Sequence, residues 1–201
     1  MKSDEYKTIR GFKRAEIKVK GSRFIASVEC TESMADVEKF IAAINGEFHD
    51  ATHNCYAYRY GRGVELNEHY NDHGEPSGTA GIPILNAIKS KELTNTTIVV
   101  TRYFGGTKLG TGNLARAYSA SATEVLTDKN IIMKIVTAEI KLVTPADTVS
   151  AVYHNLNNYK GRVLSEIYNP DAEFRVEVRE SVVEDFKSAL IEATNGRVNF
   201  L

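Results

Sequence analysis

The sequence predicts an α+β protein made of two domains that meet near residue 134. Its length, 201 residues, favours two small domains over one. The last third alternates strand and helix patterns in the order βαββαβ, whereas the preceding residues carry two glycine-rich segments, each followed by a helical pattern. We therefore expect domains over residues 1–134 and 135–201.

Composition and targeting signals place the chain among cytoplasmic proteins. It is 42% hydrophobic and 25% charged, which excludes disordered and collagen-like classes. No apolar run approaches the roughly 18 residues of a membrane span, and the N-terminus does not resemble a secretory signal. The two cysteines, Cys30 and Cys55, lie far apart, as in a reducing compartment. We expect a cytoplasmic protein without a membrane partner.

Strand and helix patterns alternate through the first domain. A pair of strands broken at Gly21 fills residues 7–30, and later strands are centred on aromatic or β-branched runs. The last helix has apolar or small residues on one face, from Leu114 to Val125. Between these, we expect a helix over 33–45, strands over 53–60 and 64–70, a short helix over 83–90 and a strand over 97–102.

The second domain follows the ferredoxin-like pattern. Its order is a strand over 135–143, a helix, strands over 162–168 and 174–178, a second helix, and a strand over 197–201. Thr144 followed by Pro145 predicts the start of the first helix. Ser181 and Glu184 predict a capping box for the second, which should bury its apolar face: Val183, Phe186, Leu190 and Ala193.

The small net charge of −1 hides a difference between the domains. Residues 1–134 hold 18 Lys or Arg against 16 acidic residues, while residues 135–201 hold 7 against 10. Most of the first domain's excess lies in a basic run over 7–23, opposed there only by Glu16. This run could contact phosphates, or its cations could simply solvate edge strands and discourage aggregation.

The two glycine-rich segments, 74–81 and 101–112, are the strongest candidates for a site. Backbone N–H groups at a helix start, unobstructed beside glycine, favour an anion. We predict a basic, partly aromatic anion or phosphodiester site, shaped also by the first segment. The alternative is that the glycines only permit tight turns over a buried Tyr103 and Phe104. The predicted site residues are Arg102, Tyr103, Lys108, Arg116, Glu75, Ser77 and Thr79.

Neither segment matches a nucleotide-binding fingerprint. Lys108 is followed by Leu109, whereas the Walker pattern needs Ser or Thr, and no dinucleotide-binding βαβ unit surrounds Gly110–Gly112. Two histidine pairs, 49/53 and 69/73, lack the helical setting of a zinc site. We expect no cofactor and no metal.

Catalytic candidates are weaker than the candidate anion-binding residues. A hydrolase would have to use acid–base groups near the first glycine-rich segment: His53, Asp72, Glu75 and Thr79. Ser77 lacks a nucleophile elbow. Cys55 beside Tyr56 is typical of a small buried hydrophobe.

Three ordered segments resemble the YigZ/IMPACT family, and the resemblance covers essentially the whole chain. The first is Ala51–Tyr58, the second Gly74–Gly81, and the third runs from Val99 through Gly112, with Leu114 and Arg116–Tyr118 extending it. The resemblance implies a first domain with the left-handed βαβ fold seen in a small-subunit ribosomal protein, elongation factor G and gyrase. It implies a second domain like the last domain of elongation factor G.

Two positions depart from the family pattern. His73 stands where the family usually has an acidic residue, and Asn113 stands where it usually has a glycine. Because Asn tolerates positive φ better than most residues, we expect a turn at position 113 to survive.

The resemblance implies a link to translation. Eukaryotic relatives act in translational control by binding the activator of a kinase, through an additional domain that is not among these residues. We expect a non-enzymatic, translation-linked protein that binds RNA or the ribosome through the first domain. A hydrolase of phosphorylated or peptide substrates and a protein–protein adaptor are the alternatives.

Overall fold

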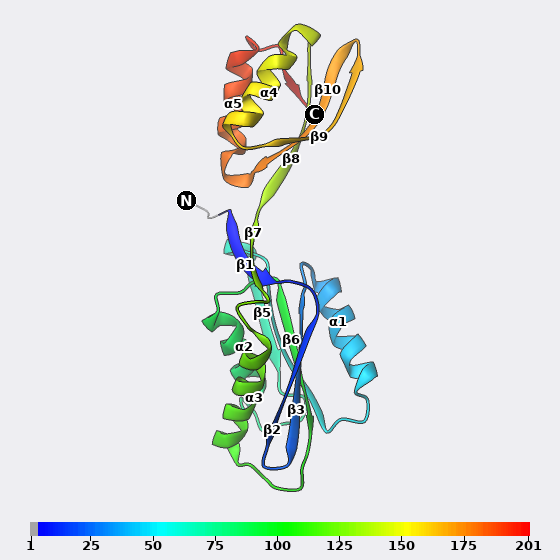
Figure 1. Cartoon of the computed structure of the whole chain (residues 1–201), viewed down its shortest axis with the longest axis vertical. Helices are drawn as coiled ribbons and strands as arrows, with labels where there is room; N and C mark the ends of the chain where they lie inside the picture. Colours follow the sequence, from blue (N-terminus) through cyan, green and yellow to red (C-terminus); the bar gives the residue numbers. More distant parts are fainter. Residues whose placement is uncertain (1–3) are drawn as a thin grey trace. The chain divides into compact units, whose positions relative to one another are not determined.

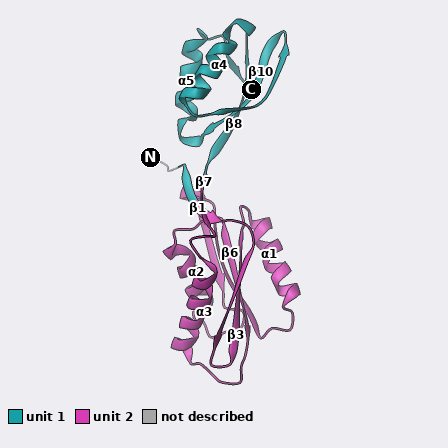
Figure 2. Ribbon diagram, viewed as in Figure 1, with its two compact units in different colours: residues 1–6, 135–201 teal, residues 7–134 magenta. Residues whose placement is uncertain are grey.

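The computed structural model describes residues 4–201, which form two compact units (Figure 2). One comprises residues 7–134, and the other comprises 135–201 together with 4–6. The expected boundaries placed residues 4–6 in the first domain. They belong to the second because the Asp4 carboxylate accepts hydrogen bonds from the Ser181 hydroxyl and, at 2.8 Å, from its backbone N–H. Residues 1–3 of that expected domain lie outside the described residues.

The first unit is built on a five-stranded sheet of order β2-β3-β6-β4-β5. Both β3 and β4 run antiparallel to β6, which lies between them. Strands β3 and β4 are therefore parallel, and α1 makes the crossover of a βαβ unit. The elements are β2 (Lys13–Val19), β3 (Ser22–Cys30), α1 (Met34–Glu47), β4 (His53–Tyr60), β5 (Asn67–Asn71), α2 (Gly81–Ser90), β6 (Thr96–Tyr103) and α3 (Thr111–Val125).

Helices cover both faces of this sheet (Figure 1). Helices α2 and α3 pack on one face, where Phe24, Ile84, Val100 and Tyr118 are fully buried in the main core. Helix α1 covers the other face through a smaller cluster around Phe40 and Val99. Because β6 is central and covered on both sides, its apolar run is continuous and does not alternate.

The first unit differs from the expected elements at its N-terminal strands. Three strands replace the predicted pair, because β1 (Glu5–Ile9) ends before Gly11, which has φ +63°. Strand β1 pairs with β7 (Ile131–Ile135) in a separate two-stranded sheet. The predicted strand 64–70 starts late, because Gly63–Glu65 forms a 3-10 turn.

The second unit confirms the ferredoxin-like prediction. Its sheet order, β11-β8-β10-β9, with α4 and α5 as crossovers, is that of a βαββαβ fold. The core lies between the sheet and the helices and centres on Phe174 and Phe186. The elements are β8 (Thr137–Thr144), α4 (Val149–Asn158), β9 (Arg162–Asn169), β10 (Asp171–Arg179), α5 (Val183–Ala193) and β11 (Asn199–Phe200).

Both predicted helix starts in this unit are wrong. A 3-10 turn, Ala146–Thr148, follows Pro145 and delays α4. The capping box at Ser181 does not form, because that side chain bonds to Asp4 and α5 begins at Val183. Ala193 is exposed, not buried, and the last strand is only two residues long.

No helix among residues 4–201 combines the length and the apolar character needed to cross a membrane.

Two glycines bring the β2–β3 turn against the loop that follows β6. A Cβ on Gly21 would lie 2.9 Å from the Gly105 carbonyl oxygen, and a Cβ on Gly105 would overlap the Gly21 backbone. The Gly105 N–H also donates to Ser22 Oγ at 3.1 Å. This contact fixes the second glycine-rich segment against the β2–β3 hairpin, which carries most of the basic run and is called the basic hairpin below.

We predict that Gly105→Ala lowers the free energy of unfolding by about 2 kcal/mol or more, because the added methyl group forces the two backbones apart. The matched control is Gly112→Ala, where the Cβ meets only the end of the Arg116 side chain, at 3.9 Å. Because alanine favours a helix more than glycine does, the free energy of unfolding of that variant should be unchanged or up to about 1 kcal/mol higher. Urea unfolding measures both, and equal losses would contradict the close approach.

Candidate functional site

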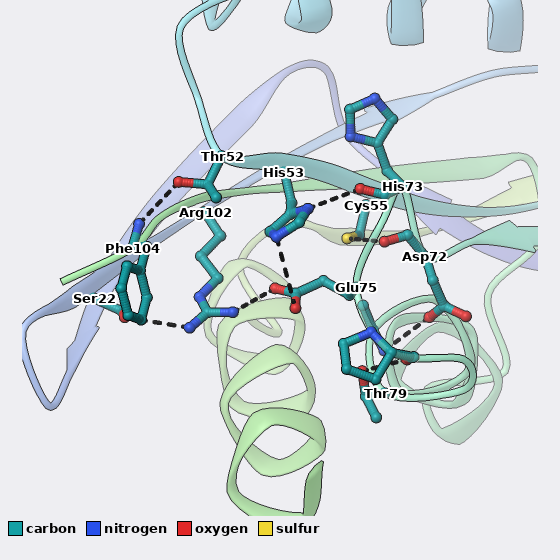
Figure 3. Close-up of polar contacts among 12 residues, drawn as sticks. Ser22, Thr52, His53, Cys55, Asp72, His73, Glu75, Thr79, Arg102 and Phe104 are labelled. Atoms are coloured by element: carbon teal, nitrogen blue, oxygen red, sulfur yellow. Dashed lines mark hydrogen bonds and ion pairs between the residues drawn. The ribbon is translucent and has the colours of Figure 1, made fainter. Parts of the chain in front are cut away.

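The candidate site lies where β4, the 72–81 loop, the end of β6 and the start of α3 meet (Figure 3). Antiparallel pairing places His53 of β4 directly opposite Arg102 of β6. Beside them is a pocket of about 400 Å³. It is lined by Thr52, His53, Glu75, Pro76, Arg102, Phe104, Lys108, Leu109, Gly110, Thr111 and Leu114.

A buried ion pair forms the floor of the pocket. Arg102 Nη1 lies 2.6 Å from Glu75 Oε1, and the two side chains are only 7% and 4% exposed. The Tyr118 hydroxyl donates to the same carboxylate oxygen at 2.8 Å. The guanidinium lies between two rings, 5.4 Å from the centroid of Phe24 and 5.6 Å from that of Phe104. Arg102, predicted as a phosphate contact, is thus already neutralised by an internal carboxylate.

His53 is held in one orientation beside this pair. Its Nδ1 donates to the His73 carbonyl oxygen at 2.8 Å, so Nδ1 carries the hydrogen. Its Nε2 lies 3.8 Å from Glu75 Oε2. The His73 ring is also engaged, since its Nδ1 accepts from the Asn54 N–H at 3.0 Å. His73, the first departure from the family pattern, therefore anchors the loop to β4.

Asp72 fills the anion position in the first glycine-rich segment. Its carboxylate accepts hydrogen bonds from the N–H groups of Gly78, Ala80 and Gly81, at 2.8 to 2.9 Å. Burial alone would raise the pKa of Asp72, but these three backbone donors hold it below its ordinary value. The start of α2 is thus occupied by the chain's own carboxylate.

The start of α3 has no such internal anion. Its N-cap is Gly110, with φ +75°, and no side chain caps the helix. Lys108 and Thr111 line the pocket beside these free amides, and Lys108 has no hydrogen-bond or ion-pair partner among residues 4–201. Arg116 is exposed one turn along the helix and donates to Asn113 Oδ1 at 2.9 Å.

Asn113, the second departure, does not occupy the expected positive-φ turn. It lies within the first turn of α3, where its Nδ2 donates to the Leu109 carbonyl at 2.9 Å. The left-handed conformations belong to Gly106 and Gly110. Position 113 therefore does not require a residue that tolerates positive φ, because the backbone there is helical.

The remaining predicted residues lie outside the pocket or are engaged elsewhere. The Tyr103 hydroxyl donates to Asp50 at 2.7 Å, and the Thr79 hydroxyl to the Pro76 carbonyl at 2.6 Å. Ser77 is exposed on the loop and is not among the lining residues. Cys55 is buried, and burial raises the pKa of its thiol to about 12, so it is not a thiolate nucleophile.

The sequence interpretation missed Tyr118 as part of the site. Its place on the buried face of α3 suggested packing alone, yet its hydroxyl bonds Glu75. The available signal was chemical, since a buried tyrosine needs a partner for its hydroxyl. For metals, residues 4–201 contain no group of three or more His, Cys, Asp or Glu side chains placed to hold an ion.

Comparison with known proteins identifies both units. The Impact N-terminal domain model matches residues 20–126, and a domain of unknown function, DUF1949, matches residues 148–197. The chain is 37% identical over 199 residues to the IMPACT family member YvyE of Bacillus subtilis, covering 96% of this chain and 88% of that protein. The chain belongs to the IMPACT family.

Other relatives span both units. The IMPACT family member YigZ of Escherichia coli is 28% identical over 184 residues, covering 91% of this chain and 90% of its own. A solved structure titled as the crystal structure of an hypothetical protein matches with TM-score 0.69 and 26% identity, covering 98% of this chain and 96% of that one. The two-domain architecture is thus shared with that solved structure, and the similarity to YigZ extends through both units.

We predict that Asp72→Asn lowers the unfolding free energy by about 1–2 kcal/mol at pH 7, because the charge that satisfies three amides is lost. The folded-state pKa of Asp72 is depressed, so its stabilisation is present above the unfolded value and is lost as pH falls through the folded value.

The variant should therefore lose less stability than the parent on acidification below about pH 4. Urea unfolding at several pH values measures this difference. Asp128→Asn is the control, because that side chain is 93% exposed. Identical acid profiles for parent and Asp72→Asn would refute the capping role.

Proposed function

We propose that the first domain binds RNA phosphates at the start of α3, as part of a role in translation. The observation that carries this proposal is the contrast between the two helix starts. Asp72 satisfies the amides of α2, whereas α3 begins at an uncapped glycine beside the unpartnered Lys108. Uncapped amides, the helix dipole and a nearby cation together favour a phosphate group.

Cations of the basic hairpin support a contact surface that extends over more than one RNA phosphate. Its turn, Lys20–Gly21, packs against Gly105, and Arg23 lies over the Tyr103 ring, 5.5 Å from its centroid. Lys18 and Lys20 are exposed and form no ion pair among the described residues. Together with Lys108 and Arg116, they are the cations that the proposal assigns to RNA phosphates.

Part of the basic run serves a different role. Lys7, Arg14 and Arg23 form ion pairs with Glu92, Glu47 and Glu16, at 2.6 to 3.0 Å. Cations paired in this way fit the alternative interpretation of the run, in which its charges solvate edge strands and discourage aggregation. The proposed contact surface is therefore small and depends on a few unpaired cations.

The second domain lacks the features of an RNA-binding sheet. On the sheet face opposite its core, Arg175 pairs with Glu139, and Arg162 pairs with Glu177. The one aromatic residue of β10, Phe174, is buried in the core, so this strand presents no ring beside these charges as an RNA-recognition motif would. The proposal accordingly assigns the contact to the first domain.

Translation is proposed as the setting because of family membership. The protein IMPACT homolog of Dictyostelium discoideum is 36% identical over 94 residues, which is 45% of this chain and 27% of that protein. The part shared with that eukaryotic relative is thus confined to about one domain. A sedimentation profile of cell lysate, with and without RNase, tests whether the protein travels with ribosomal subunits and whether RNA retains it.

We predict that purified protein binds single-stranded RNA with an affinity that falls steeply with salt. Each phosphate contact contributes a slope of about 0.7 in a plot of log affinity against log salt. Lys108→Ala and Arg116→Ala should each reduce the slope by about that amount. Fluorescence anisotropy with a labelled oligonucleotide, titrated at several salt concentrations, provides the measurement.

Lys129→Ala is the matched control, since that exposed lysine lies beyond the opposite end of α3. Its slope should equal that of the parent. A binding isotherm that does not respond to salt, or no binding at about 50 mM salt, would overturn the proposal. Capture of a protein partner that survives RNase would favour the adaptor alternative.

A further inference from the structure

We propose that the pocket at the start of α3 receives one unstacked nucleotide of the RNA, with its base inside and its phosphate at the rim. This inference rests on the proposed function and specifies the ligand of the same site. The preferred base carries an exocyclic amine. Four features of the pocket support this assignment: unsatisfied polar atoms at the floor, an acidic floor, largely apolar walls and a cationic rim.

The floor presents an acceptor and a donor that lack partners. Glu75 Oε2 accepts no hydrogen bond from residues 4–201, and His53 Nε2 lies 3.8 Å from it. Arg102 Nε is buried and also has no partner among these residues. The buried Arg102 Nε costs free energy while it has no acceptor, and Glu75 Oε2 is free to accept, so a ligand that supplies both a donor and an acceptor is favoured. The edge of a nucleobase offers this combination.

The charge at the floor determines which end of the ligand enters. Arg102 is already paired with Glu75, so the carboxylate neutralises the nearest cation. A phosphate placed against Glu75 would meet like charge in a dry environment, which is strongly unfavourable. The end of the ligand that enters is therefore neutral and bears an N–H donor.

The walls suit a flat aromatic group. Phe104 lies at the mouth with 46% of its surface exposed, and Leu109, Leu114 and Pro76 supply further apolar surface. The Phe104 backbone N–H donates to Thr52 Oγ1 at 3.0 Å, which holds this residue in place. Bases stack on such exposed rings in single-stranded nucleic-acid sites. The volume of about 400 Å³ falls within the range of small-ligand pockets.

The rim suits the phosphate. Lys108 and Thr111 line the pocket, as does Gly110, where the uncapped amides of α3 begin. A nucleotide can therefore present its base edge to Glu75 Oε2 and its phosphate to the helix start. Adenine, cytosine and guanine each offer an exocyclic amine to the carboxylate. The one donor on the pairing edge of uracil, N3–H, lies between two carbonyl oxygens, which the carboxylate repels.

Binding of mononucleotides to the full chain tests the inference. Calorimetry, together with amide chemical shifts of Gly110, Thr111 and Gly112, is measured with GMP, AMP, CMP, UMP, guanosine and inorganic phosphate. We expect the three amine-bearing nucleotides to bind several-fold more tightly than UMP. They should also bind more tightly than guanosine or phosphate alone.

Two exposed phenylalanines provide a matched pair of variants. Phe104→Ala should weaken nucleotide binding about tenfold through lost stacking, and leave phosphate binding unchanged. Phe12→Ala removes a ring of equal exposure, 46%, that is not among the residues lining the pocket. It should leave both affinities unchanged. Lys108→Ala should weaken both nucleotide and phosphate binding.

The outcomes separate this inference from the proposed function. If RNA binds with a Lys108-dependent salt slope but mononucleotides do not shift the Gly110–Gly112 amides, the nucleotide pocket is wrong and RNA binding stands. If phosphate binds as tightly as GMP and Phe104→Ala has no effect, the site holds only an anion and the inference is overturned. If mononucleotides bind as described but RNA does not, the pocket assignment is supported and the proposed RNA function fails.

Discussion

The buried ion pair between Arg102 and Glu75 is the constraint on which the site depends. It ties the end of β6 to the 72–81 loop, and Tyr118 extends the same network to α3. Two charges this deeply buried are tolerated because each has a partner, and removing either would leave an uncompensated charge in the interior. The loop is therefore held in one position relative to the sheet. This rigidity gives the pocket a fixed floor, with His53 and Phe104 placed around it.

The two glycine-rich segments have similar sequences, but the helix start after the first is capped by a carboxylate and the helix start in the second is uncapped. Each precedes a helix, and each offers backbone amides to an anion. In the first, Asp72 supplies that anion from within the chain, so the segment is a structural element that orients Glu75. In the second, the helix begins at Gly110 without a cap, and Lys108 lines the same pocket as Gly110. Sequence pattern alone could not distinguish these states, because the distinction depends on which carboxylate folds back onto which helix.

Features set by residues close together in the sequence could be predicted, whereas features set by contacts between distant residues could not. The ferredoxin-like order was recoverable because each element of the second domain carries its own periodicity, as in the alternation of buried and exposed residues along β10. The capping box at Ser181 was not, because its competitor, Asp4, lies 177 residues away in the sequence. The burial of Arg102 escaped for the same reason: an arginine beside glycines resembles a surface cation until its partner, 27 residues earlier, is known. Local rules therefore located the candidate site and missed its internal pairing.

The distribution of charge limits how a chain of net charge −1 would bind RNA under the proposed function. Three of the seven cations in the basic run are committed to ion pairs, and Arg102 is neutralised at the pocket floor. Bulk attraction to a polyanion is consequently weak, and the few remaining cations can engage only a few phosphates. If RNA binds as proposed, discrimination among its bases would depend on shape and hydrogen bonding at the pocket more than on charge. An acidic group at the floor then favours selectivity, because it repels phosphate from the interior and rewards only a neutral group that can donate to it.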